Sequence, residues 1–231
     1  MKKIKKVFLL IPVAILLISL LFVKKEETKK VLLLGDNSNI KVHLQNQLKD
    51  YHVEEFTLST IKSKELLYYV TSNAHINVDN KKKTLNELIK SSDFIVISIG
   101  LNDIISKIVL NKYEKSVSYD VDNMNLAFSL LEQNLFNIIE HIELVNDKTN
   151  IILTSYNDPF VFLDKEDENH ALIKNLNSLM NSISLLFDAN YLEIVFDNEN
   201  YYENEFSFYL NDEGKRKIAE NIYQKIVAIN Q

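Results

Sequence analysis

The stretch DFIVISIGLND, residues 93–103, contains the most strand-like segment of this 231-residue chain. Its near-continuous apolar run is typical of a parallel strand that is buried on both faces. It ends at Gly100, with Asn102 and Asp103 directly behind. The apolar residues 31–34 likewise run into Gly35 and Asp36. Ligands of parallel sheets bind outside the C-terminal strand ends, so we expect any site to lie at these two ends.

The rest of the chain alternates between strand-like and helix-like patterns. Further strands are predicted at residues 53–58, 150–155 and 191–196, and helices at about 40–48, 63–70, 85–89, 121–145, 171–187 and 212–228. Residues 73–83 are polar and aperiodic, which predicts a surface loop. Five strands that alternate with helices predict an α/β fold of three layers, α/β/α, around a parallel sheet.

The composition limits both the fold and the function. About 200 residues beyond the N-terminal segment suit one domain. The net charge is −6 and no basic face is evident, which argues against nucleic-acid binding. The chain has no cysteine, which excludes disulfides, a thiol nucleophile and cysteine-bound metal. We expect no cofactor and no metal site. The three glycines, Gly35, Gly100 and Gly214, are expected where the backbone needs a positive φ or a close approach to another segment, and the alternative for Gly35 and Gly100 is simply a tight turn after a strand.

The N-terminus has the pattern of a membrane anchor. Four lysines within residues 1–6 precede an unbroken apolar run, residues 7–23. As a helix this run would span about 26 Å, just short of the hydrocarbon core of a bilayer. A cleaved signal peptide is the alternative, but no small-residue cleavage pattern follows the run. We therefore expect a transmembrane helix at 1–23, a charged linker at 24–30 and one domain at 31–231.

The lysines do not indicate on which side of the membrane the domain lies, because four of them lie on each side of the apolar run. The lysine rule therefore gives no preference. A short N-terminal segment before a large domain usually leaves that domain outside the cytoplasm. We expect a single-pass protein of the cell membrane with an extracytoplasmic domain.

Four segments resemble sequence blocks of the SGNH (GDSL-type) hydrolases, in particular the lysophospholipase-like, membrane-anchored bacterial members. They are VLLLGDNSN at 31–39, ISIGLNDI at 97–104, SYNDPF at 155–160 and YLNDEGKRKIAENI at 209–222. They are similar to the Gly-Asp-Ser block, the Gly-x-Asn-Asp block, the loop after strand 4 and the Asp-x-x-His block. The resemblance covers about residues 31–229. It implies a flavodoxin-like sheet of five parallel strands in the order 2-1-3-4-5.

The same resemblance implies that most catalytic residues of the family are replaced here. The serine nucleophile falls on Asn37, the histidine base on Tyr209 and the triad aspartate on Phe206. The oxyanion-hole glycine falls on Thr60, whereas the oxyanion asparagine is present as Asn102. An amide is not a nucleophile near neutral pH, a phenol is a poor base there, and a phenyl ring orients nothing by hydrogen bonding. The pattern therefore favours a domain without hydrolytic activity.

Two functions remain open from the sequence. The first is a domain displayed at the membrane that binds an acyl-ester or glycan ligand or a partner, with Asn102 as a hydrogen-bond donor and Tyr209 as a stacking face. In that case Gly35, Asp36, Gly100 and Asp103 would shape the site, or would serve only as scaffold. The alternative is an active esterase or acylhydrolase on lipid or glycan esters, with Ser38 as an atypical nucleophile. Ser38 would need a base, and all five histidines lie outside the expected block: His43, His52, His75, His141 and His170.

Overall fold

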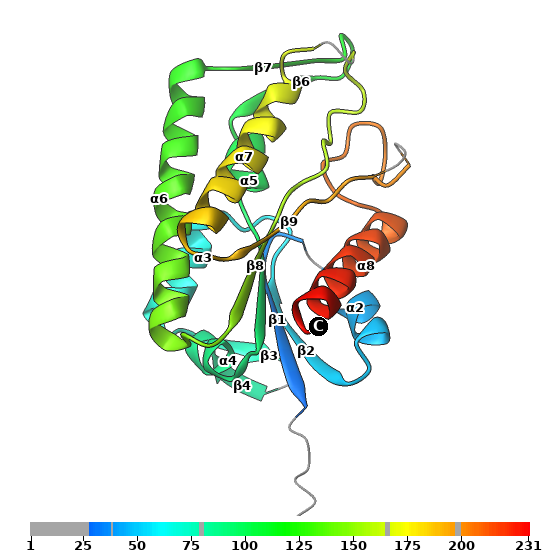
Figure 1. Cartoon of the computed structure of the whole chain (residues 1–231). Coiled ribbons are helices and arrows are strands. Elements are labelled where there is room, and N and C mark those ends of the chain that lie inside the picture. Colours follow the sequence, from blue (N-terminus) through cyan, green and yellow to red (C-terminus); the bar gives the residue numbers. More distant parts are fainter. Residues whose placement is uncertain (1–27, 38, 79–80, 165–166, 197–199) are drawn as a thin grey trace, which may run out of the picture.

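The computed structural model describes residues 28–37, 39–78, 81–164, 167–196 and 200–231, and it has a three-layer α/β architecture (Figure 1). The central sheet has the order β2-β1-β5-β8-β9, and every neighbouring pair is parallel. Its strands are β1 (Lys29–Gly35), β2 (Tyr51–Thr57), β5 (Phe94–Ser98), β8 (Asn150–Thr154) and β9 (Asn190–Leu192). The predicted fold class and the strand order 2-1-3-4-5 are confirmed.

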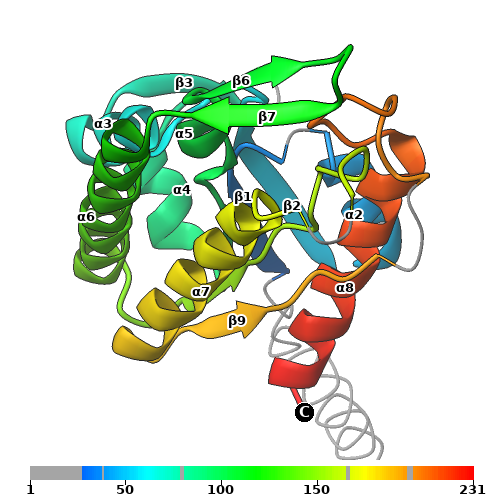
Figure 2. The same ribbon diagram turned by 90° about the horizontal axis from the view of Figure 1, so that it is seen from above.

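Helices cover both faces of the sheet (Figure 2). One face packs against α3 (Ser63–Ser72), α4 (Leu85–Ser91), α6 (Val121–Val145) and α7 (His170–Leu186), and the other against α2 (Lys41–Gln47) and α8 (Asp212–Ile229). In β1, Leu32 and Leu34 belong to the first core, whereas Val31 and Leu33 belong to the second. Two buried faces explain why the strand sequence is apolar throughout.

Two hairpins differ from the sequence-based expectation. The predicted loop at 73–83 is wrong, because His75–Val78 and Lys81–Thr84 pair antiparallel as β3 and β4. Only Ile76 and Val78 alternate inward, and the second strand is lysine-rich, so the period-two signal was too short to recognise. A second hairpin, β6 (Ile108–Asn111) with β7 (Ser116–Tyr119), was not anticipated and joins α5 (Leu101–Ile105) to α6.

The strand predicted at 191–196 is shorter in the structure, where β9 spans only Asn190–Leu192. None of the helices in the described parts of the chain is both long and apolar enough to cross a bilayer. The predicted anchor, residues 1–23, lies outside the described residues, as does the linker up to residue 27.

Candidate functional site

The C-terminal ends of β1 and β5 meet without a side chain between them. Gly35 has φ +117°, and a Cβ at this position would lie 1.8 Å from the carbonyl oxygen of Ser98. The next amide, that of Asp36, donates to the same carbonyl over 2.7 Å. Glycine is therefore required here both for backbone conformation and for space. The tight junction positions Asp36 and Asn37 beside the end of β5.

Asn102 lies in α5, the short helix that starts after Gly100, and its side chain is buried. Its Nδ2 donates to the carbonyl oxygen of Ser59 over 2.9 Å and to that of Ile61 over 3.1 Å. An amide nitrogen has two hydrogens, so both are used by the loop between β2 and α3. In this arrangement Asn102 holds that loop and has no hydrogen left for a ligand.

Asp103 connects α5 to the start of α3. Its carboxylate accepts from the Ser63 amide at 2.9 Å and from the Ser63 hydroxyl at 2.7 Å. The same hydroxyl accepts from Asn134 Nδ2 of α6 at 2.9 Å. Burial raises the pKa of Asp103, and the hydrogen bonds from Ser63 oppose that rise. The contacts of Asp103 are therefore those of a helix-capping residue.

Asp36 is a buried carboxyl group with one satisfied oxygen. Tyr156 donates its phenolic hydrogen to Oδ1 over 2.6 Å, whereas Oδ2 has no hydrogen-bond partner in the described part of the chain. Burial raises the pKa of Asp36 to about 7, and the bond from Tyr156 works against that rise. Burial and the nearby Asp36 raise the pKa of Tyr156 well above its ordinary value. The pair therefore carries less than a full charge near neutral pH.

A cavity of about 230 Å³ opens above these strand ends. Asp36, Asn37, Asn102 and Tyr209, four of the residues singled out from the sequence, line it together. The other lining residues, which come from loops and helix starts, are Asn39, Ile40, Ser59, Leu101, Ser155, Tyr156, Asn157, Pro159, Phe196, Tyr202, Glu203, Phe208, Leu210, Lys215 and Ile218.

The remaining sequence-predicted residues lie elsewhere. Gly35, Thr60, Gly100 and Asp103 are not among the residues that line the cavity, and Ser59 lines it next to Thr60. Ser38 lies outside the described residues.

The loop before α8 presents Tyr209 to the pocket but not Phe206. The Tyr209 side chain is 39% exposed, and its backbone amide donates to the Ser207 hydroxyl. The Phe206 ring lies 5.1 Å from that of Phe162, and the Lys112 ammonium group of the β6–β7 turn lies 5.8 Å from the Phe206 ring centre. Phe206 therefore packs this loop against Phe162 and the β6–β7 turn.

Comparison with known proteins gives a fold but no sequence relative. No protein-family model matches the chain, and no curated protein is detectably similar in sequence. The acetyl xylan esterase AlAXEase superposes with a TM-score of 0.61 at 13% identity, over 85% of this chain and 99% of that one. A GDSL-like lipase from Bacteroides thetaiotaomicron gives 0.56 at 16% identity, over 87% and 89%. The chain has an SGNH-hydrolase fold.

A third neighbour, a family 3 carbohydrate esterase from Clostridium thermocellum, gives a TM-score of 0.57 at 16% identity, over 88% of this chain and 97% of that one. At these identities the likeness concerns the SGNH fold alone.

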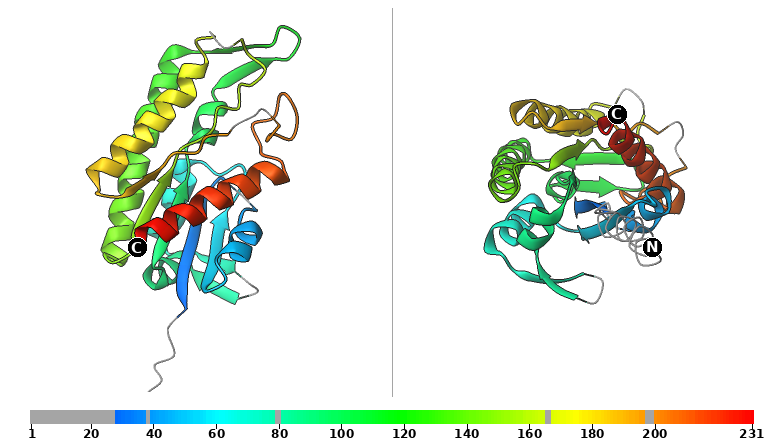
Figure 3. Two further views of the ribbon diagram at one scale, coloured as in Figure 1. Left: turned by 45° about the vertical axis from the view of Figure 1, so that its right-hand side comes forward. Right: turned by 60° about the horizontal axis from the view of Figure 1, so that its bottom comes forward.

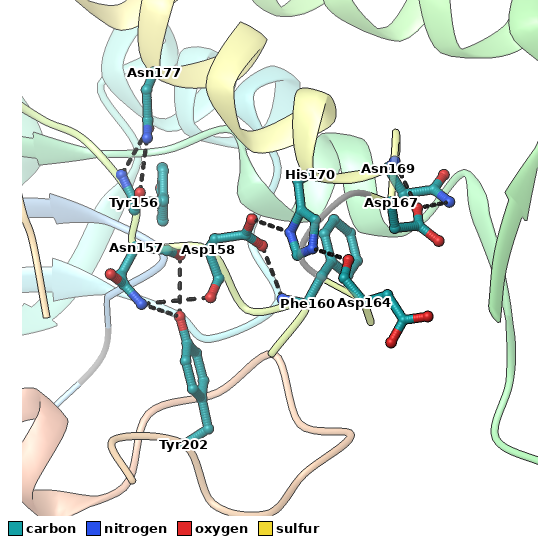
Figure 4. A network of polar contacts seen from close by, with 10 residues as sticks. All are labelled: Tyr156, Asn157, Asp158, Phe160, Asp164, Asp167, Asn169, His170, Asn177 and Tyr202. Atoms are coloured by element: carbon teal, nitrogen blue, oxygen red, sulfur yellow. Dashed lines mark hydrogen bonds and ion pairs between the residues drawn. The ribbon is translucent and has the colours of Figure 1, made fainter. Parts of the chain in front are cut away.

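The wall of the pocket after β8 is held by a polar network (Figure 4). Asn177 of α7 makes two bonds with the Tyr156 backbone, each of 2.8 Å. The Tyr202 hydroxyl donates to the Asn157 carbonyl over 3.0 Å and lies 3.2 Å from Asn157 Nδ2. Two loops far apart in the sequence are thereby joined. The segment SYNDPF indicated the first loop, but no sequence signal indicated Tyr202 as its partner.

None of the five histidines lines the pocket of this SGNH fold. His170 comes nearest to a catalytic arrangement, because its Nδ1 lies 2.6 Å from Asp158 Oδ2 (Figure 4). Its Nε2, however, lies 3.0 Å from the Asp164 carbonyl oxygen. A carbonyl oxygen only accepts, so Nε2 must carry a hydrogen and is not free to act as a base. Among the described residues no group of three histidine, aspartate or glutamate side chains could hold a metal ion.

Proposed function

We propose that this chain is a non-hydrolytic SGNH-like domain that binds an uncharged polar ligand, an acyl-ester or a glycan, in the pocket above β1 and β5. The proposal includes the N-terminal run 7–23 as a membrane anchor that holds the domain outside the cytoplasm. The observation that carries it is the lining of the pocket. Asn37 and Tyr209 lie where the resemblance expects serine and histidine, and no histidine lines the cavity.

The loss of hydrolysis follows from these two positions. An amide cannot be deprotonated into a nucleophile, and a phenol accepts protons poorly at neutral pH. Removal of the catalytic residues of a serine hydrolase costs about 10⁶-fold in rate. The one retained oxyanion residue, Asn102, gives its amide hydrogens to Ser59 and Ile61. Little support for a tetrahedral intermediate therefore remains.

The chemistry of the pocket suits a neutral ligand with oxygen atoms and apolar faces. Amides of Asn37, Asn39 and Asn157 line it together with the rings of Phe208 and Tyr209. The Asn37 Nδ2 is buried and unpaired among the described residues, and an unpaired buried donor costs about 1–3 kcal/mol. A ligand oxygen that reached it would relieve that cost. Aromatic faces beside amide donors are a combination that binds sugar rings and acyl groups.

Binding of acetylated xylo-oligosaccharides to the purified full chain tests the proposal, with recovery of the ligand by mass spectrometry. We expect a ligand-dependent rise in melting temperature, loss of that rise in Tyr209→Ala, and an intact acetyl ester. The matched control is Tyr113→Ala, which removes a fully exposed tyrosine of the β6–β7 turn. Failure of acetylated and deacetylated oligosaccharides and of simple acyl esters to bind would overturn the binding claim. Release of acetate would instead support the alternative esterase that uses Ser38.

A further inference from the structure

The direction of β1 separates the N-terminus from the pocket. β1 starts at Lys29, next to the first described residue, and ends at Gly35 below the pocket. Seven residues of parallel strand cover about 20 Å. In Figure 1 β1 starts at the lower end of the sheet, whereas the loops that follow the strands and the β6–β7 hairpin lie at the upper end. The point of entry and the site are therefore at opposite ends of the molecule.

The end where the chain enters is rich in lysine. We call it the basic end and define it as the segments that lead into the sheet strands, together with the lysines of β4: 29–30, 48–50, 81–83, 90–93, 146–149 and 187–189. These segments contain eight lysines and four aspartates. Lys29, Lys49, Lys82, Lys90 and Lys148 are exposed. The right-hand view of Figure 3 turns this end toward the reader. A net positive end is unexpected in a chain whose net charge is −6.

The opposite end is strongly acidic. We define this acidic end as the described residues that follow the sheet strands, together with the β6–β7 hairpin: 36–37, 39–40, 58–62, 100–120, 155–164, 167–169, 193–196 and 200–212. They contain twelve aspartates and glutamates but only four lysines. The pocket lies at this end, and the charged residues of its lining are Asp36, Glu203 and Lys215. The charge of the domain is thus polarised along the same axis as β1.

We propose that the basic end lies on the anionic phospholipid headgroups of the membrane that holds the N-terminal run. Lysines near an anionic bilayer surface are attracted to it, whereas the acidic end is repelled. The pocket then faces the aqueous side, and its ligand is a water-borne neutral molecule rather than a lipid of that membrane. This inference rests on the anchor and the pocket of the proposed function.

The length of the linker supports this orientation. The five residues 24–28 between the apolar run and β1 extend to at most about 18 Å. α6 runs along the domain between its two ends, and its 25 residues measure about 37 Å (Figure 1). The linker is too short to turn the domain over and bring the acidic end to the bilayer.

Quenching by headgroup-labelled nitroxide lipid tests the orientation in the full chain, reconstituted in vesicles. The chain has no cysteine, so single dye sites are made by Asn77→Cys on β3, opposite Lys82, and by Tyr113→Cys at the tip of the β6–β7 turn. In vesicles with phosphatidylglycerol we expect strong quenching at position 77 and none at position 113. The quenching at 77 should weaken in phosphatidylcholine alone and at high salt. Equal quenching at both sites, or stronger quenching at 113, would overturn the proposal.

Charge reversal assigns the effect to the basic end. Lys49→Glu with Lys148→Glu should lower the quenching at 77 several-fold in anionic vesicles. Lys64→Glu with Lys107→Glu, which reverses two exposed lysines outside the basic end, should leave it unchanged. Equal loss in both double variants would contradict the assignment. Oligosaccharide affinity, measured in the same vesicles, tests the proposed function separately. If the quenching pattern is as expected but no oligosaccharide binds, only the function of the pocket is refuted. If oligosaccharide binds but the quenching pattern is absent, only the docking surface is refuted.

Discussion

The floor of the pocket, meaning the ends of β1 and β5 with the start of α5 below the cavity, and the loop before α8 both resemble sequence blocks of the SGNH family, but they differ in how their residues are used. The floor has Gly35, Asp36 and Asn102, and each contacts the backbone or buried side chain of another segment. The loop has Phe206 and Tyr209 where the resemblance expects aspartate and histidine. The residues of the floor hold strand ends and loops together, whereas the loop presents Tyr209 to the cavity and packs Phe206 against Phe162. The comparison separates residues that hold the fold from a residue that faces the cavity.

The largest expected effect tests the structural role of the floor. Gly35→Ala puts a Cβ 1.8 Å from the Ser98 carbonyl at a φ of +117°. Because the clash is with backbone, we expect a loss of more than about 4 kcal/mol of stability, or no soluble protein. Urea denaturation measures it. In Gly100→Ala the new Cβ would meet the flexible ends of Leu131 and Leu176, so the loss should be smaller. A small loss of stability in Gly35→Ala would contradict the structural role given to the floor of the pocket.

Asp36 predicts a pH dependence of stability. Its pKa is raised from 3.8 to about 7, so the folded state keeps a proton that the unfolded state has released. Unfolding therefore releases a proton between pH 4 and 7, and stability falls as the pH rises through this window. Relative to Asp36→Asn, the unmodified chain should lose about 3 kcal/mol between pH 4 and pH 7.5. Denaturation curves with the same pH dependence in both proteins would show that Asp36 is not the buried acid described.

Asn102→Ala sharpens the same comparison with a smaller effect. The variant leaves the carbonyls of Ser59 and Ile61 without their donor, which should cost about 2 kcal/mol. Since both amide hydrogens are used within the fold, ligand affinity should change little once the variant is folded. Thermal unfolding and calorimetric titration measure the two quantities. Lost affinity at an unchanged melting temperature would make Asn102 a binding residue instead.

The smallest expected effects distinguish two residues of the loop. Phe206→Ala removes the ring that packs against Phe162, which should cost about 1–2 kcal/mol and leave affinity unchanged. Tyr209→Ala should do the reverse, because its ring is partly exposed in the pocket. Its stability should stay within about 0.5 kcal/mol. If the two variants change stability and ligand affinity in the same way, Phe206 and Tyr209 do not have separate packing and binding roles.

The sequence predicted the sheet well because each strand, such as β1, is buried against two cores and is therefore apolar throughout. It missed the β3–β4 and β6–β7 hairpins, whose strands have four residues each and little alternation. Of the residues that the resemblance singled out, Asn37 and Tyr209 line the cavity, whereas Thr60 does not and its neighbour Ser59 does. The wall formed by Phe196, Tyr202 and Phe208 had no sequence signal, because tertiary bonds such as Tyr202 to Asn157 position it.

Intact mass of the full chain after incubation with a fluorophosphonate probe tests the central claim most directly. A fluorophosphonate labels a serine only when a neighbouring base has activated it. With Asn37 and Tyr209 in the pocket and no histidine in its lining, we expect the mass to remain unchanged. A stoichiometric adduct mapped to Ser38 would contradict the account and show that the pocket belongs to a working hydrolase.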